Sequence, residues 1–129
     1  MLIGKVTAEN QAVVPIEVHG YEGHKAHVDA TVDTGYNGYL TLPRSLVDEL
    51  DLPSAGPAQA SLGDGNEVRM ELFLAAVRWE ERLQDVLVLA AEGGVLLGMA
   101  MLLGCRLTLD AEADGNVSIE PLTQVRAVN

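Results

Sequence analysis

The feature that most constrains the fold is a succession of short alternating apolar runs broken by glycine-rich turns. Val28, Ala30 and Val32 alternate with polar residues, which is the two-residue period of a half-buried strand. Comparable runs recur at the roughly 8–12-residue spacing that is typical of small β-barrels and sandwiches. Helical periodicity is scarce. The sequence therefore predicts a mainly β fold, a small closed barrel with one or two short helices.

Turn signals divide this pattern into elements. Asp64-Gly65 predicts a hairpin turn at residues 63–66, because Asp-Gly tolerates the positive φ angles of tight turns. Pro43 followed by apolar residues at helical spacing predicts a short helix at residues 43–50, and residues 51–58 are predicted to form a loop. Residues 85–90 are apolar enough for a strand buried on both faces. Strands are expected at residues 13–18, 28–32, 39–42, 68–74, 85–90, 105–110 and 116–121, with a short apolar helix after residue 98.

Composition narrows the function classes. The 129 residues, 48% of them hydrophobic and 21% charged, fit one globular domain over residues 1–129. The formal net charge is −11 and no basic run occurs, which argues against a nucleic-acid or anionic-membrane partner. The N-terminus lacks signal-peptide character, and the longest apolar stretch, residues 93–105, is too short and too rich in glycine to span a bilayer. We therefore expect a cytoplasmic protein.

Three local patterns resemble ligand sites but are better explained by structure. Cys105 is the single cysteine, which excludes an intrachain disulfide and a cysteine-rich metal site, and its alternating run predicts packing on a strand. The acids within residues 110–115 are spaced like the start of a calcium loop, but the glutamate required at the end of that loop is missing, so we expect a plain hairpin. His19, His24 and His27 are expected to be solvated turn histidines. No metal and no cofactor is predicted.

The motif that bears chemistry lies where the strand at residues 28–32 ends, at Asp33-Thr34-Gly35. The tripeptide alone is weakly specific, because Asp and Gly are common in turns. Two further features follow it in a fixed order. The Asp-Gly hairpin comes about thirty residues later, and residues 96–98, two leucines and a glycine, then lead into a short apolar helix.

This order resembles that of the retroviral-type, single-domain aspartic proteases, and in particular of their bacterial relatives, in which an aromatic residue follows Asp-Thr-Gly. The resemblance rests on DTGYNGYLTLP at residues 33–43 and LLGMAMLLGCRLTLD at residues 96–110, and it covers most of the chain. It implies a homodimeric, retropepsin-like barrel that hydrolyses peptide bonds in peptides or proteins.

The resemblance also assigns roles to residues. Asp33 matches the catalytic aspartate, and Thr34 matches the threonine whose hydroxyl bonds across the dimer axis. Gly35 matches the glycine that lets the loop turn and brings backbone N–H groups near the carboxylate. The segment that supports the catalytic loop is matched by Leu96, Leu97 and Gly98, and the flap over the substrate by Gly63, Asp64, Gly65 and Asn66.

The chain departs from the retroviral pattern in two places. Tyr36 stands where the retroviral proteins carry a small residue, so the resemblance implies a differently shaped substrate site. Met99-Ala100 replaces the Arg and the Asp or Asn that often follow the glycine, so an ion pair at that position is absent and dimer stability must come from elsewhere.

The chemistry explains why one Asp-Thr-Gly per chain is sufficient. Peptide hydrolysis by this route needs two carboxylates that share one proton, one to activate water and one to donate to the carbonyl oxygen. A single motif supplies one carboxylate, and a two-fold dimer places the same residue opposite itself.

Two other interpretations remain open at this point. The chain can keep the fold and act as a catalytically silent dimeric binding or assembly module, because a fold does not determine a function. It can also be a stand-alone barrel in which Asp33 is an ordinary turn residue.

Overall fold

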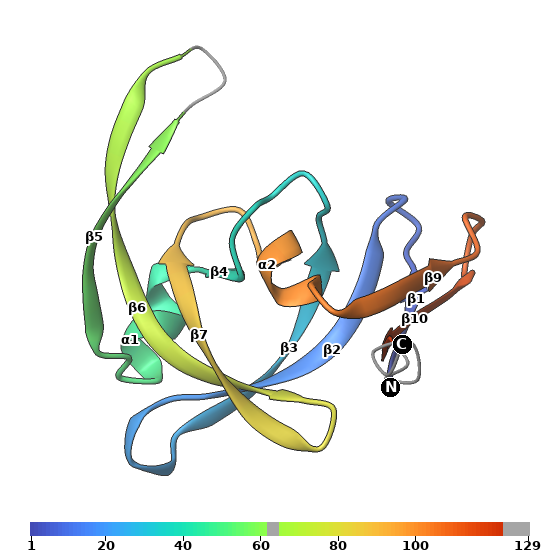
Figure 1. The fold of residues 1–129 in the computed structure, drawn as a ribbon, viewed down its shortest axis with the longest axis horizontal. Helices are drawn as coiled ribbons and strands as arrows, with labels where there is room; N and C mark the ends of the chain where they lie inside the picture. Colours follow the sequence, from blue (N-terminus) through green and yellow to red (C-terminus); the bar gives the residue numbers. More distant parts are fainter. Residues whose placement is uncertain (62–64, 123–129) are drawn as a thin grey trace, which may run out of the picture.

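The structure is a computed structural model that describes residues 1–61 and 65–122. These residues form ten strands, two short α-helices and one 3-10 helix, which confirms the mainly β fold predicted from the sequence (Figure 1). The strands are β1 (Leu2–Val6), β2 (Ala12–His19), β3 (Lys25–Val32), β4 (Leu40–Leu42), β5 (Ser54–Ser61), β6 (Glu67–Trp79), β7 (Arg82–Ala90), β8 (Leu96–Leu97), β9 (Cys105–Leu109) and β10 (Asn116–Pro121). The helices are η1 (Tyr21–Gly23), α1 (Arg44–Glu49) and α2 (Met99–Leu102).

Six of the strands close into a ring. The hydrogen-bonded order runs β2, β3, β8, β4, β7 and β6, and β6 then pairs back onto β2 through Val18↔Val77 and His19↔Ala76. Two of these contacts, β3 with β8 and β4 with β7, are parallel and join segments that are far apart in the sequence. Closure removes free strand edges inside the ring, which agrees with the small barrel predicted from the sequence.

Aliphatic side chains from all parts of the ring fill its interior. Along β2, Val14, Ile16 and Val18 are buried while their neighbours are not, as the alternation of the sequence predicts. Helix α1 adds Val47 to the same core. Burying one Val or Leu side chain contributes about 1.5–3 kcal/mol, so apolar burial in the ring stabilises the framework that carries the loops.

Three strands extend the sheet beyond β2. β1 pairs with β2 through two residue pairs and with β10 through four, and β10 pairs on its other side with β9. β9 therefore lies at one end of the sheet and has one unpaired edge. β1 was not predicted from the sequence, because it is short, contains Gly4, and finds its main partner more than a hundred residues away.

The predicted loop at residues 51–58 is wrong in its second half. β5 begins at Ser54 and pairs with β6 from Ser54↔Phe73 onward, with a bulge between Ser54 and Gly56. Gly56 has a φ of 102°, which accommodates the bulge. The glycine and proline content of residues 51–58 indicates a loop, but the long β6 strand provides a pairing partner that outweighs this local preference.

The prediction that residues 85–90 are buried on both faces is also wrong. Val86 and Val88 are buried, whereas Leu87 is exposed. No second layer covers the outer face of β7 within the described residues, so only its inner side contributes to the core.

The β9–β10 turn at residues 110–115 agrees with its prediction, so the acidic segment is a plain hairpin. A further turn after Trp79 joins β6 to β7. The β5–β6 hairpin projects well beyond the ring (Figure 1). Gly63 and Asp64 of its predicted turn lie outside the described residues. None of the helices in the described part of the chain has the length and apolar character needed to cross a membrane.

Candidate active site

Asp33 is positioned by the strand that precedes it. β3 ends at Val32, where it pairs in parallel with β8 through Val32↔Leu97, and the Asp33 N–H donates to the Leu97 carbonyl oxygen at 2.9 Å. This bond holds the start of the loop to the centre of the ring. The loop that follows lies on the same side of the ring as the projecting β5–β6 hairpin (Figure 1).

The loop closes on the Asp33 carboxylate. The Gly35 N–H donates to Asp33 Oδ1 at 2.9 Å, and the Tyr36 N–H donates to the Asp33 carbonyl oxygen at 3.1 Å. This hydrogen bond fixes the orientation of the Asp33 carboxylate. Asp33 is partly exposed, and Thr34 and Gly35 are exposed, so the carboxylate is accessible at the surface of this chain.

Residues 96–98 support the loop, although more than fifty residues separate them in sequence from its end. The Gly98 N–H donates to the Tyr39 carbonyl oxygen at 3.0 Å, and the Met99 N–H donates to that of Tyr36 at 2.8 Å. The Ala100 N–H donates to the Gly38 carbonyl oxygen at 3.1 Å. These three bonds join residues 98–100 to the second half of the loop, residues 36–39.

Gly98 is required by this close approach. A Cβ at this position would lie 2.2 Å from the Gly38 carbonyl oxygen and 2.5 Å from Cδ2 of Tyr36. The backbone of residue 98 is therefore in direct contact with the Tyr36 ring. Any side chain at this position would push the loop away from its support.

Tyr36 is part of the loop wall. Its ring packs between Gly98 and Gly38, where a Cβ on Gly38 would lie 2.3 Å from the Tyr36 hydroxyl oxygen. Burial raises the pKa of Tyr36, so its phenol stays neutral through the physiological range and keeps its proton for hydrogen bonding.

Thr41 was missed by the sequence analysis. It is buried in β4, its hydroxyl donates to the Gly94 carbonyl oxygen at 3.2 Å, and the Leu96 N–H donates to that hydroxyl at 2.9 Å. Thr41 thus ties β4 to the segment that leads into residues 96–98. The available signal was a hydroxyl between two leucines in a buried strand, where a polar group needs a partner.

The structure places only part of the predicted flap. Gly65, with a φ of 89°, and Asn66 lie at the described end of the β5–β6 hairpin, whereas Gly63 and Asp64 lie outside the described residues. Gly65 and Asn66 belong to the projecting hairpin and not to the Asp33 loop.

A charged cluster lies toward the opposite end of the β2–β3 hairpin. Glu17 contacts His19 Nε2, its Oε1 lies 3.0 Å from His27 Nε2, and its Oε2 lies 3.5 Å from Arg78 Nε. The hydrogen bond with His19 is the main reason that the pKa of Glu17 falls from 4.5 to about 2, and Lys25 adds to it. The prediction of a solvated turn histidine is therefore wrong for His19, which is largely buried beside Glu17. Within residues 1–61 and 65–122, no group of three or more His, Cys, Asp and Glu side chains is arranged to hold a metal ion.

Comparison with known proteins identifies the architecture. No protein-family model matches the chain, and no curated protein matches its sequence. Among solved structures, the crystal structure of a retropepsin-like aspartic protease from Rickettsia conorii matches 94% of this chain and 91% of its own, with a TM-score of 0.55 and 14% identity. The fold is retropepsin-like. The solution structure of the simian foamy virus (mac) protease matches 68% of this chain and 90% of its own, with a TM-score of 0.49 and 17% identity.

The retropepsin-like fold accounts for the relative positions of the Asp33 loop, residues 96–98 and the β5–β6 hairpin. The Asp33 loop and residues 96–98 are hydrogen-bonded to each other, and the β5–β6 hairpin projects on the same side of the ring as this loop (Figure 1). At this level of identity the likeness establishes the fold, and the chemistry must be argued from the residues themselves.

Proposed function

We propose that this protein is an aspartic endopeptidase in which two copies of Asp33, one from each subunit of a homodimer, activate a water molecule. The observation that carries the proposal is the Asp33 loop, in which an accessible carboxylate accepts a backbone N–H from Gly35 and is held from behind by residues 96–98. This long-range support fixes the position of the carboxylate, as a catalytic group requires.

The proposed mechanism uses carboxylates and water. One Asp33 is ionised and takes a proton from the water whose oxygen attacks the peptide carbonyl carbon. The other Asp33 is protonated and donates to the carbonyl oxygen, which gives a neutral tetrahedral intermediate. Collapse of this intermediate breaks the C–N bond: the carboxyl group that gained a proton from water gives it to the leaving nitrogen, and the other Asp33 carboxylate takes a proton from a hydroxyl of the intermediate as the new carbonyl forms. The pair thus ends with the one proton it started with.

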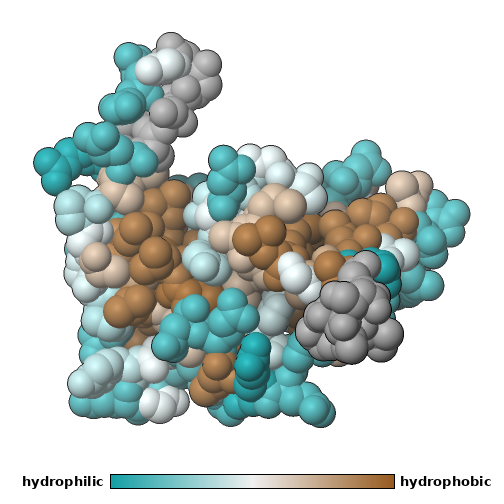
Figure 2. All heavy atoms as spheres, viewed as in Figure 1, coloured by the Kyte–Doolittle hydropathy of each residue, from teal (hydrophilic) through white to brown (hydrophobic). Residues whose placement is uncertain are grey.

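The surface that would join the two copies lies beside the loop. Met99 and Leu103 at α2 and Leu109 on β9 are exposed apolar residues, and Leu103 is 74% exposed. We call these three residues the α2–β9 surface, and Figure 2 shows the apolar side chains gathered over these elements. The Met99 N–H bonds directly to the Tyr36 carbonyl oxygen, so contact at this surface would bring two Asp33 loops together.

β9 also offers a backbone edge to a second copy. It pairs with β10 on one side only, and a free strand edge is a template for pairing with another chain. In a two-fold dimer the β9 strands of both subunits would pair antiparallel, because an isologous interface sets each residue against the same surface of its partner. The half-site at Asp33 would be completed by the same contact.

Two further assignments belong to this proposal. The β5–β6 hairpin, with its predicted tip at Gly63, Asp64, Gly65 and Asn66, would cover the bound peptide. Tyr36, whose ring packs against Gly98, would shape the substrate site beside the carboxylates.

Peptide cleavage by the parent and by Asp33→Asn, measured across pH 3 to 8, tests the proposal. Asp29→Asn is a suitable control, because Asp29 is an exposed aspartate on the same strand, and it should cleave like the parent. Equal cleavage by Asp33→Asn and the parent would contradict the peptidase assignment. A folded parent dimer that cleaves no peptide would instead favour a silent binding or assembly module with the same fold.

A further inference from the structure

The outer face of the β6–β7 pair is apolar and uncovered. On this face Leu72 lies opposite Leu89 and Leu74 lies opposite Leu87, whereas Phe73, Ala75 and Val77 point into the core. Leu74 is 45% exposed, Leu87 is 38% exposed, and Leu83 further along β7 is 46% exposed. We call Leu74, Leu83 and Leu87 the β6–β7 surface, and Figure 2 shows a broad apolar area over these two strands.

A groove opens at the margin of this surface because two strands share one edge of β6. β5 pairs with β6 as far as Phe73, where the Leu74 N–H still donates to the Pro53 carbonyl oxygen at 2.9 Å. β2 pairs with the same edge only at Ala76 and Val77. The gap between them forms a groove of about 230 Å³, lined by His19, Gly20, Tyr21, Pro53, Leu74, Ala75, Ala76 and Asp85.

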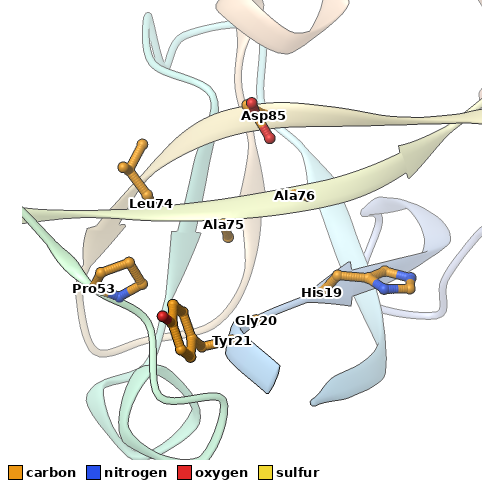
Figure 3. A pocket seen from close by; sticks show the side chains of 8 residues that line it. All are labelled: His19, Gly20, Tyr21, Pro53, Leu74, Ala75, Ala76 and Asp85. Atoms are coloured by element: carbon orange, nitrogen blue, oxygen red, sulfur yellow. The ribbon is translucent and has the colours of Figure 1, made fainter. Parts of the chain in front are cut away.

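The groove has one apolar wall and one acidic side. In Figure 3 the Tyr21 ring lies next to Pro53 with Leu74 nearby, and Asp85 lies across β6 on β7. Asp85 is exposed and forms no ion pair with a described residue. The basic side chains nearest in the sheet, His19 and Arg78, are already engaged, because both contact the Glu17 carboxylate. The unpaired charge at the groove is therefore negative.

The volume and charge of the groove indicate which kind of molecule it can bind. The volume is below the roughly 300–1,000 Å³ of a small-molecule site, so the groove fits one side chain of a larger molecule. A second copy of this chain is disfavoured at the groove, because the groove carries an unpaired acid and the chain has few basic side chains to offer it, 8 Lys and Arg against 19 Asp and Glu. Strand addition at the groove is also disfavoured, since β5 and β2 pair with the β6 edge on either side of Leu74 and Ala75 and leave only this short gap.

We propose that this groove binds a segment of a partner polypeptide that carries an apolar side chain next to an arginine or lysine. The apolar side chain enters between Tyr21, Pro53 and Leu74, and the basic group meets the Asp85 carboxylate. The site lies at the end of β2, far along the ring from the Asp33 loop. Binding is independent of peptidase activity, and it remains testable if the proposed function fails.

The test uses two peptides that differ only in charge. Acetyl-Gly-Ser-Leu-Arg-Ser-Gly-amide and its counterpart with Glu in place of Arg are titrated into the ¹⁵N-labelled full chain with Asp33→Asn, which excludes cleavage during the measurement. The arginine peptide should perturb the amide signals of residues 19–21, 74–76 and 85 in a saturable manner. The glutamate peptide should bind at least fivefold more weakly. Equal binding of the two peptides, or perturbation confined to other residues, would overturn the proposal.

Matched variants distinguish binding in the groove from nonspecific binding to exposed apolar surface. Leu74→Ser should weaken binding of the arginine peptide about tenfold, because it removes the buried contact of one leucine. Leu83→Ser is the control, since Leu83 is equally exposed on the same face but does not line the groove. Asp85→Asn should weaken binding about two- to fivefold, as expected for an exposed ion pair, whereas Glu81→Gln should not.

Thermal melts of the variants show that each remains folded. An equal loss on Leu83→Ser would indicate nonspecific apolar binding and would contradict the groove. Sedimentation of the same samples tests whether a second copy of this chain occupies the face instead. A change of oligomeric state on Leu74→Ser would mean that a second copy covers this face, and the proposal would then be wrong.

Discussion

The α2–β9 surface and the β6–β7 surface have similar side chains and different surroundings. Leu109 of the first lies on β9, which has an unpaired edge, and Met99 is hydrogen-bonded to the Asp33 loop, whereas Leu74 and Leu87 of the second lie on strands in the interior of the sheet. Exposed apolar area alone therefore does not identify a partner. A free backbone edge and a half-complete site favour a second copy at the α2–β9 surface, and a groove with an unpaired acid favours a basic peptide at the β6–β7 surface.

The largest expected effect is at the Asp33 loop, which lies next to the α2–β9 surface. Asp33→Asn removes both carboxylates of a dimer at once, and loss of acid–base assistance costs about two to four orders of magnitude in rate. Thermal stability should not fall, because the variant removes the two like charges that would face each other across the axis of the proposed dimer. Peptide cleavage and thermal melts of the same preparation measure both results. Unfolding of Asp33→Asn would indicate that Asp33 is a structural turn residue.

Mixing the two forms shows whether the site is shared. If each active site needs one Asp33 from each subunit, and the subunits exchange freely, activity at constant total protein should fall with the square of the parent fraction. A linear fall would show that each chain acts alone and that contact at the α2–β9 surface is not needed for catalysis.

The comparison between the surfaces is tested directly by placing a charge on each. Leu103→Asp puts an acid at the centre of the proposed interface in both subunits, and we expect the dissociation constant of the dimer to rise about 100-fold, or about 2.7 kcal/mol. Activity should fall at low protein concentration and recover at high concentration. Sedimentation and cleavage across a concentration series measure this. Leu83→Asp makes the same change on the β6–β7 surface and should leave dimerisation unaltered, so a similar effect of both variants would refute the distinction.

A smaller effect is expected at the support of the loop. Gly98→Ala places a methyl group against the Gly38 carbonyl oxygen and the Tyr36 ring, and overpacking of this kind costs about 1–3 kcal/mol of unfolding free energy. Gly35→Ala serves as the comparison, because its Cβ would lie 3.3 Å from Asp33 Oδ1 and meets no other atom within contact distance. Urea unfolding should show a clear loss for Gly98→Ala and a minor loss for Gly35→Ala. Equal stability of Gly98→Ala and the parent would mean that residues 96–98 do not support the loop as described.

The smallest expected effect is a pH dependence of stability that is due to Glu17, which belongs to neither surface. The folded pKa of Glu17 is about 2 against 4.5 for the ordinary group, so its ionised form is favoured by folding. Its contribution to stability is therefore fully present above pH 4.5 and is lost as the pH falls through 2. Glu17→Gln should lower the melting temperature at pH 6 and converge with the parent near pH 2, while the exposed control Glu9→Gln should follow the parent throughout. A constant difference at all pH values would show that the effect of Glu17 is not electrostatic.

Most of the strands could be predicted because their signals are local. The alternation at residues 28–32 and the Asp-Gly and Asp-Ala-Glu-Ala-Asp-Gly turns depend on neighbours in the chain, and the structure confirms the strands they delimit. β1 and the first half of β5 were missed, because they are held mainly by partners distant in sequence, β10 and β6. Composition alone could not show which face of residues 85–90 is covered, since burial depends on whether another layer is present.

The sequence by itself determined most of the strands and their order, the position of Asp33 at a strand end, and the resemblance that connects residues 33–43 with residues 96–110. Only the tertiary structure decided that the ring closes through β2 and β6, that Thr41 ties β4 to residues 94–96, and that Gly98 leaves space for Tyr36. It also decided that one edge of β9 is unpaired and that Asp85 borders a groove. The physical reason is that alternation and turn chemistry act within a few residues, whereas pairing, close packing and exposed edges depend on which distant segments meet.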